Sequence, residues 1–166
     1  MFKTSHRENR VVAIAAERMF DVVADVERYP EFVPLMQKAT VVRRCDRAYE
    51  TEQVLAVGLL TYRWRTRTEL DPPRSILVTT ADQNFHHLLI RWSFTPEPDG
   101  QCRVGFELDC AVRWFWLKPL GDALVAQMAL TTVDAFVARA RSQEATERAL
   151  TTSPTSGESG CMQRVA

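Results

Sequence analysis

The fold is decided by one alternating stretch, Leu60-Thr61-Tyr62-Arg63-Trp64-Arg65-Thr66-Arg67-Thr68-Glu69-Leu70. Its even-numbered side chains are apolar or amphipathic, whereas nearly all of its odd-numbered side chains are charged. An extended backbone turns successive side chains to opposite faces. The stretch therefore predicts an antiparallel strand with one face against a core and the other in water.

The same alternation recurs farther along the chain. It is clearest in Leu88-Ile90-Trp92-Phe94 and in Val104-Phe106-Leu108-Cys110-Val112. Turn-forming residues separate the runs, at Cys45-Asp46-Arg47, Gly58, Asp71-Pro72-Pro73, Asp82-Gln83-Asn84 and Pro96-Glu97-Pro98-Asp99-Gly100. Residues 38–112 are therefore predicted to form a meander of hairpins. With a first strand ending near Ile14, the result is a curved antiparallel sheet of about seven strands.

A short amphipathic helix is predicted before the meander, from Ala16 to Asp25, because apolar residues recur at helical spacing. It lacks a good N-cap, since alanines stand where serine or aspartate would be expected. The following run, Tyr29-Pro30-Glu31-Phe32-Val33-Pro34, cannot extend the helix far, because proline disfavours the helical conformation in the residue before it. We expect a bent, partly helical connection there.

A long helix is predicted after the meander. Pro119 suits its first turn, and an apolar stripe runs to about Ala140 through Leu120, Leu124, Met128, Thr132 and Phe136. Such a helix would be roughly 30–35 Å long, enough to cross a whole sheet. Beyond Arg141 the sequence has no apolar period. Residues 1–142 are therefore predicted to be one domain, and residues 143–166 a disordered tail.

Composition narrows the classes of function. Lysine plus arginine and aspartate plus glutamate balance at 21 each, which argues against bulk attraction to DNA or anionic lipid. The polar N-terminus does not resemble a signal peptide, and no run approaches the ~20 apolar residues of a membrane span. We therefore expect a cytoplasmic protein. The four cysteines lack metal-site spacing, which predicts free thiols and no metal.

One concave sheet face and one helix must supply the whole core, and a bent sheet that grips a helix need not close along its length. We therefore expect an apolar tunnel. Its predicted lining is Phe32, Leu35, Tyr62, Trp64, Phe85, Leu88, Trp92, Phe94, Phe106, Leu108, Leu124 and Met128. The alternative is that the large aromatic residues fill a solid core.

Catalytic chemistry is not indicated. The sequence contains no nucleophile motif, phosphate-binding glycine loop or paired carboxylates. Adjacent His86 and His87 should point to opposite faces of an extended strand, so one of them could face inward, but no acidic partner is evident from spacing. The prediction is a binding protein with no catalytic residues and no required cofactor.

Two surface features are open to more than one interpretation. Outward-facing Arg63, Arg65, Arg67 and Arg91 could form a positive stripe that contacts RNA, or could be balanced on the sheet face by Glu50, Glu52 and Glu69, which is the interpretation we prefer. The run Trp114-Phe115-Trp116-Leu117 precedes the long helix. It could gate the tunnel and dip into a membrane interface, or form an apolar hinge packed under the helix.

Three ordered motifs resemble one known family. They are Met19-Phe20 with Asp25-Val26-Glu27-Arg28-Tyr29-Pro30-Glu31-Phe32-Val33-Pro34, then Phe85-x-x-Leu88-x-x-x-Trp92-x-Phe94, then Ala135-Phe136-Val137-Ala138-Arg139-Ala140. They resemble the coenzyme Q-binding START-like proteins of the polyketide cyclase/dehydrase and lipid transport superfamily, which includes a bacterial ribosome-association toxin branch. The chain departs from that pattern at Leu35-Met36, where the family has Trp-Cys, and at Asn84.

The resemblance implies an α+β helix-grip (START/Bet v 1-like) fold with a sheet wrapped around the long C-terminal helix. It also implies that ubiquinone or a related lipid binds in the tunnel. The role would be to support respiration or quinone biosynthesis and delivery, with transient contact at the inner face of a respiratory membrane. The main alternative is a ribosome-associated regulator or toxin that binds the large ribosomal subunit. A polyketide cyclase-like enzyme is less favoured.

Overall fold

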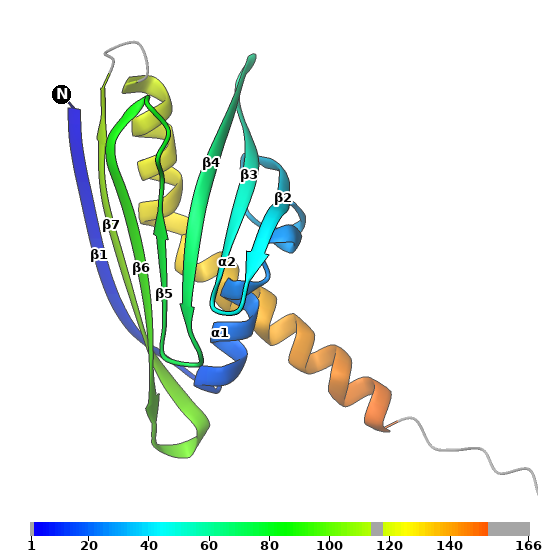
Figure 1. The fold of residues 1–166 in the computed structure, drawn as a ribbon. Helices are drawn as coiled ribbons and strands as arrows, with labels where there is room; N and C mark the ends of the chain where they lie inside the picture. The colour runs from blue at the N-terminus through cyan, green and yellow to red at the C-terminus, as the bar shows by residue number, and fades with distance from the viewer. Residues whose placement is uncertain (1, 114–117, 153–166) are drawn as a thin grey trace, which may run out of the picture.

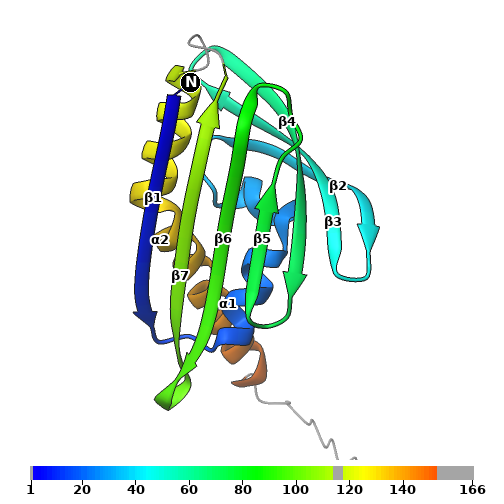
Figure 2. The ribbon, with the colours of Figure 1, turned by 60° about the vertical axis from the view of Figure 1, so that its left-hand side comes forward.

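The computed structural model describes residues 2–113 and 118–152, with the side chains of all of these except Phe2, Val57 and residues 118–131. Seven antiparallel strands form one sheet in the order β1-β7-β6-β5-β4-β3-β2. The sheet curves around the long helix α2 (Figures 1 and 2). The expected fold class is confirmed. The strands are β1 (Phe2–Val12), β2 (Met36–Cys45), β3 (Ala48–Val57), β4 (Leu60–Asp71), β5 (Ser75–Thr79), β6 (Phe85–Glu97) and β7 (Gln101–Val112).

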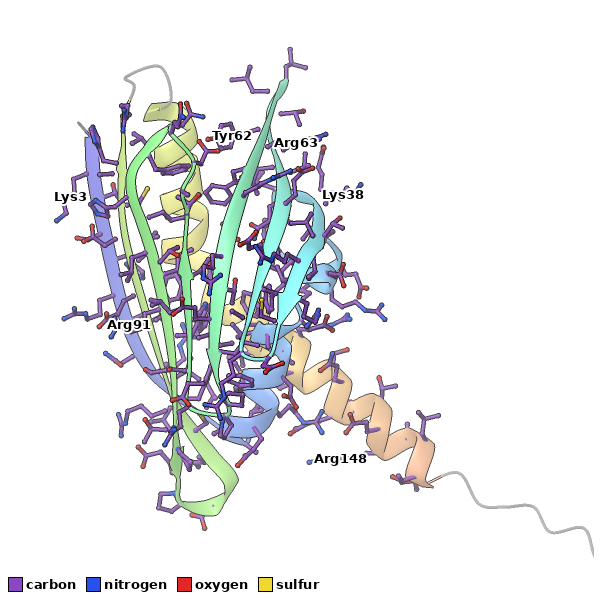
Figure 3. The ribbon with its side chains drawn as sticks, viewed as in Figure 1. Lys3, Lys38, Tyr62, Arg63, Arg91 and Arg148 are labelled. Carbon is purple, nitrogen blue, oxygen red and sulfur yellow. The ribbon has the colours of Figure 1, made fainter. Side chains whose placement is uncertain are left out.

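Strand β4 has the two faces that its alternating sequence predicts. Trp64, Thr66 and Thr68 are buried on the inner face, and the arginines between them are exposed. On the outer face Glu52 pairs with Arg63 and Arg65, and Arg67 pairs with Glu50 and Glu69. The balanced interpretation of this arginine stripe is therefore confirmed for these three arginines. Arg91 points away from α2 into solvent (Figure 3).

A short helical unit covers one end of the concave face. It consists of α1 (Ala16–Ala24) and the 3-10 helix η1 (Val26–Glu31), which contains Pro30. As expected, no side chain caps the start of α1. Two phenols bind carbonyl groups at its other end: Tyr29 Oη donates to Val23 O, and Tyr49 Oη donates to Ala24 O at 2.9 Å. Helix ends leave such carbonyls without helical partners, so these bonds fix α1 and η1 against the sheet.

Helix α2 (Lys118–Thr152) is longer than predicted. Residues 143–152 continue the helix, so the prediction of a tail without structure from residue 143 is wrong for them; residues 153–166 lie outside the described residues. Arg18 of α1 holds this last part, with Arg18 Nη2 at 2.6 Å from Glu147 Oε2 and Arg18 Nε at 3.4 Å from Glu144 Oε1. An exposed helix held by ion pairs and rich in good helix formers needs no apolar period. No helix in the described ranges combines the length and apolar character needed to span a bilayer.

Three register shifts interrupt the sheet ladders. Two lie in the edge strand β2, between Met36 and Lys38 and between Val41 and Arg43. The third lies in β6, between Phe85 and His87. Because of this third shift, His86 and His87 are both exposed, and the expectation that they point to opposite faces is wrong. His87 Nε2 instead lies 3.0 Å from Asp109 Oδ1.

Candidate ligand-binding cavity

A cavity lies between the inner face of strands β3 to β6, the segment around η1 and helix α2. The cavity has a volume of about 70 Å³, which is room for a few water molecules. A larger ligand must therefore move side chains apart. The lining is mostly apolar, and it consists of Val23, Val26, Tyr29, Val33, Pro34, Leu35, Met36, Tyr49, Gln53, Leu55, Trp64, Thr66, Thr68, Ile76, Val78, Ile90, Trp92, Thr132 and Phe136.

Phe136 joins the three walls of this cavity. Its ring centroid lies 5.0 Å from those of Tyr29 and Phe32, and 5.1 Å from that of Trp92. All three contacts are edge-to-face, an arrangement that the charge distribution of aromatic rings favours. Phe136 is 2% exposed. One side chain of α2 thus contacts both the η1 segment and the sheet.

Four buried side chains of β3 and β4, which we call the polar network, form the hydrophilic part of the wall. Thr51 Oγ1 and Thr66 Oγ1 lie 2.7 Å apart, and Gln53 Nε2 donates to Thr51 at 3.1 Å and to Thr66 at 3.2 Å. Trp64 Nε1 donates to Gln53 Oε1 at 3.1 Å. Buried polar groups are costly unless they are hydrogen-bonded, so these bonds allow polar residues at this depth.

The indole of Trp64 fixes the orientation of the Gln53 amide. An indole N–H can only donate, so the amide oxygen must face Trp64 and the amide nitrogen must face the two threonines. The amide nitrogen then lies within hydrogen-bond distance of both threonine hydroxyls. The network is therefore ordered by its own chemistry, before any ligand is present.

Two phenols in the cavity wall stay neutral over a wide pH range. Burial raises the pKa of Tyr29 well above its usual value and raises that of Tyr49 to about 12, although a hydrogen bond with Thr68 opposes the shift at Tyr49. A phenol whose pKa is raised on folding contributes stability below its unfolded pKa of about 10, and that stability is lost as pH rises toward the folded value.

We therefore expect the free energy of unfolding to fall between pH 10 and about 12, by roughly 2–3 kcal/mol for the Tyr49 contribution. Urea denaturation at a series of pH values measures this slope. In Tyr49→Phe the slope should be shallower, because the stability that deprotonation removes from the wild type, including the bond to Ala24 O, is already absent from the variant. An identical slope in the two proteins would contradict the assignment to Tyr49.

The structure brings only part of the predicted lining together around the cavity. Leu35, Trp64 and Trp92 line it, and Phe32 packs behind Phe136. The others fill the core: Leu88, Phe94, Phe106 and Leu108 are each at most 2% exposed. Helix α1 covers the part of the concave face that includes Phe94, where Phe20 meets Phe94 edge-on at 6.0 Å. For these residues the solid-core alternative describes the structure.

Tyr62 and Phe85 form a separate aromatic cluster with Trp64, in which the Trp64 and Phe85 centroids lie 5.4 Å apart. Tyr62 lies between β4 and α2 (Figure 3) and accepts a hydrogen bond from Asn84 Nδ2 at 3.1 Å. Burial raises the pKa of Tyr62 to about 12. Asn84, one of the departures from the family pattern, thus binds the phenol of a predicted site residue.

Some predicted residues cannot be placed. Trp114-Phe115-Trp116-Leu117 lie outside the described residues, so the gate and the hinge both stay predictions. Leu124 and Met128 belong to α2, in the part whose side chains are not described. Sequence reasoning missed Thr51, Gln53 and Tyr49. Period-two parity with Leu55 could have found them, because alternate residues of β3 share its inner face.

His87, Asp109 and the three described cysteines lie outside the cavity lining. Within residues 2–113 and 118–152 no group of three or more possible metal ligands lies together. A hydrogen bond with His87 lowers the pKa of Asp109, and Lys3 adds to the shift. Cys45, Cys102 and Cys110 are free thiols. Burial raises the pKa of Cys102 and Cys110 to about 11, so both stay protonated and unreactive.

The arrangement of a curved sheet, a gripping helix and an apolar cavity can be compared with known proteins. Residues 12–137 match the polyketide cyclase/dehydrase and lipid transport family. The chain belongs to this family. The structure is similar to the crystal structure of the Zhui aromatase/cyclase from Streptomyces sp. R1128, with a TM-score of 0.74 and 17% sequence identity. The match covers 84% of this chain and 94% of that one. This likeness shows the helix-grip fold alone.

Two sequence relatives represent the two branches that the motifs resemble. The ribosome association toxin RatA of Pseudomonas aeruginosa is 30% identical over 138 residues, which cover 83% of this chain and 96% of RatA. The coenzyme Q-binding protein COQ10 homolog B of Xenopus laevis is 28% identical over 136 residues, which cover 76% of this chain and 55% of that protein. The family resemblance of the sequence is thus confirmed.

Proposed function

We propose that this polyketide cyclase/lipid transport family protein binds a neutral hydrophobic molecule in its cavity and performs no catalysis. The chemistry of the cavity wall supports the binding of such a molecule, because apolar side chains surround the polar network. An acid–base enzyme needs groups that exchange protons near neutral pH. The described lining residues supply hydroxyl, phenol, indole and amide groups, and the raised pKa values of Tyr29 and Tyr49 keep these phenols neutral.

We propose further that the cellular role is association with the large ribosomal subunit, in the cytoplasm. The RatA match supports this role over quinone supply, because it spans 96% of RatA whereas the COQ10 match spans 55% of COQ10. The edge strand β2 supplies a suitable surface. Its exposed Lys38, Arg43 and Arg44 form no ion pair with any described residue, so they are available to RNA phosphates.

Sedimentation with purified ribosomal subunits tests this role. We expect the protein to cosediment with the large subunit at low salt and to be released as salt rises, because bound phosphates release counterions. A triple change of Lys38, Arg43 and Arg44 to glutamine should weaken binding roughly tenfold or more. The matched control changes Arg63, Arg65 and Arg67 to glutamine, since glutamates already neutralise these charges. Equal loss in both variants, or salt-independent binding, would contradict the role of β2.

A prenylquinone carrier is the second candidate function. The COQ10 match and the apolar cavity favour it. Burial contributes about 0.8 kcal/mol for each CH₂ group, so a few isoprene units suffice to hold a quinone. Organic extraction of the purified protein, followed by mass spectrometry, identifies the bound molecule. A prenylquinone at near-stoichiometric amount would support this candidate, and a different lipid or an empty protein would count against it.

A further inference from the structure

The polar network contains one hydroxyl proton more than its own bonds use. Thr51 and Thr66 carry two hydroxyl protons, and their mutual hydrogen bond uses one. The Gln53 amide donates to both hydroxyls, and its oxygen receives the Trp64 indole. One threonine proton therefore needs an acceptor from outside these four side chains.

The position of the two threonines decides which proton this is. Thr66 lines the cavity, whereas Thr51 is 0% exposed and lies behind it. If Thr66 donated to Thr51, the spare proton would be enclosed in the wall, at a cost of a buried unsatisfied donor. If Thr51 donates to Thr66, both lone pairs of Thr66 are filled, by Thr51 and by Gln53. The Thr66 proton is then directed to the cavity.

We propose that Thr66 Oγ1 donates a hydrogen bond to a carbonyl oxygen of the bound molecule, so that the cavity selects neutral lipids that carry a ketone or quinone carbonyl. This inference rests on the proposed ligand-binding function and names the group that orients its ligand. A hydrocarbon would leave the proton unpaired. A carboxylate would bring a buried charge to a wall whose described lining contains no lysine, arginine or histidine to pair with it.

Two probes that differ by one carbonyl oxygen test this selectivity. We would measure displacement of an environment-sensitive apolar dye from the full-length protein by 2-nonanone and by n-nonane. In Thr66→Val, affinity for 2-nonanone should fall roughly fivefold, the worth of one neutral hydrogen bond, and affinity for n-nonane should stay within about twofold. The control Thr61→Val removes a hydroxyl from the exposed face of the same strand β4, outside the cavity lining, and it should change neither affinity by more than about twofold.

Two further measurements guard against a misfolded variant. Thr66→Ser keeps the hydroxyl and should keep wild-type affinity for 2-nonanone. In the wild-type protein, the infrared stretch of carbonyl-labelled 2-nonanone should move to lower wavenumber than in hexane, as a hydrogen-bonded carbonyl does. If both probes bind but Thr66→Val affects them equally, or the stretch is unshifted, the role of Thr66 is overturned and ligand binding stands. If neither probe displaces the dye from the wild type, the proposed ligand-binding function fails as well.

Discussion

Replacing Phe136 with alanine is expected to lower the free energy of unfolding by about 3–5 kcal/mol. Phe136 is 2% exposed and contacts Tyr29, Phe32 and Trp92 at centroid distances of 5.0 to 5.1 Å. The variant loses the transfer free energy of the ring and leaves a void that rigid aromatic neighbours cannot fill. Urea denaturation with a fixed slope measures the change.

Leu150→Ala is the matched control for this variant, because Leu150 is on the same helix and is 74% exposed. Its effect should stay within about 0.5 kcal/mol. A loss below roughly 1 kcal/mol in Phe136→Ala would mean that α2 is not held against the sheet by this residue. The aromatic rings around Phe136 would then be close to it without stabilising the folded protein.

Filling the cavity is expected to have the largest effect on ligand content. Val78 lines the cavity from β5 and is only half-buried, so the phenyl ring of Val78→Phe can enter the open space of about 70 Å³. We expect co-purified lipid, measured by extraction and mass spectrometry, to fall roughly tenfold or more, with a change in unfolding free energy below about 1.5 kcal/mol.

Val42→Phe makes the same change on the exposed face of β2, where Val42 is 48% exposed, and should leave the lipid content unchanged. Wild-type lipid content in Val78→Phe would contradict the assignment of the cavity as the binding site. The same variant separates the two proposed roles. We expect it to bind ribosomal subunits as the wild type does, because Val78 belongs to the inner wall and its strand β5 is separated from β2 by β4 and β3 in the sheet.

The sheet and the long helix could be predicted because their signals are local. The alternation from Leu60 to Leu70 is a property of one strand, and the stripe through Phe136 is a property of one helix. The continuation of α2 to Thr152 could not be predicted in this way. Its last part is held by Arg18, which lies 129 residues from Glu147 in the sequence. Such a long-range ion pair produces no periodic pattern in the amino-acid sequence.

The cavity was harder to predict than the sheet for a related reason. Phe94 and Trp92 face the same side of β6, yet Trp92 lines the cavity and Phe94 is packed under Phe20. The alternation of side chains predicts which face of a strand a residue occupies. It does not predict whether a helix covers that residue. The shift between Phe85 and His87 has no signal in composition either, and it reverses the parity on which the histidine prediction relied.

The two interruptions in β2 have a consequence for behaviour at high concentration. An unbroken outermost strand can act as a template on which another chain adds by backbone pairing. Here the shifts after Met36 and after Val41 break the row of amide and carbonyl groups, and Lys38, Arg43 and Arg44 surround the breaks with like charge. Strand addition and fibril growth are thereby opposed at this edge. The outermost strand can then carry a charged binding surface without promoting self-assembly.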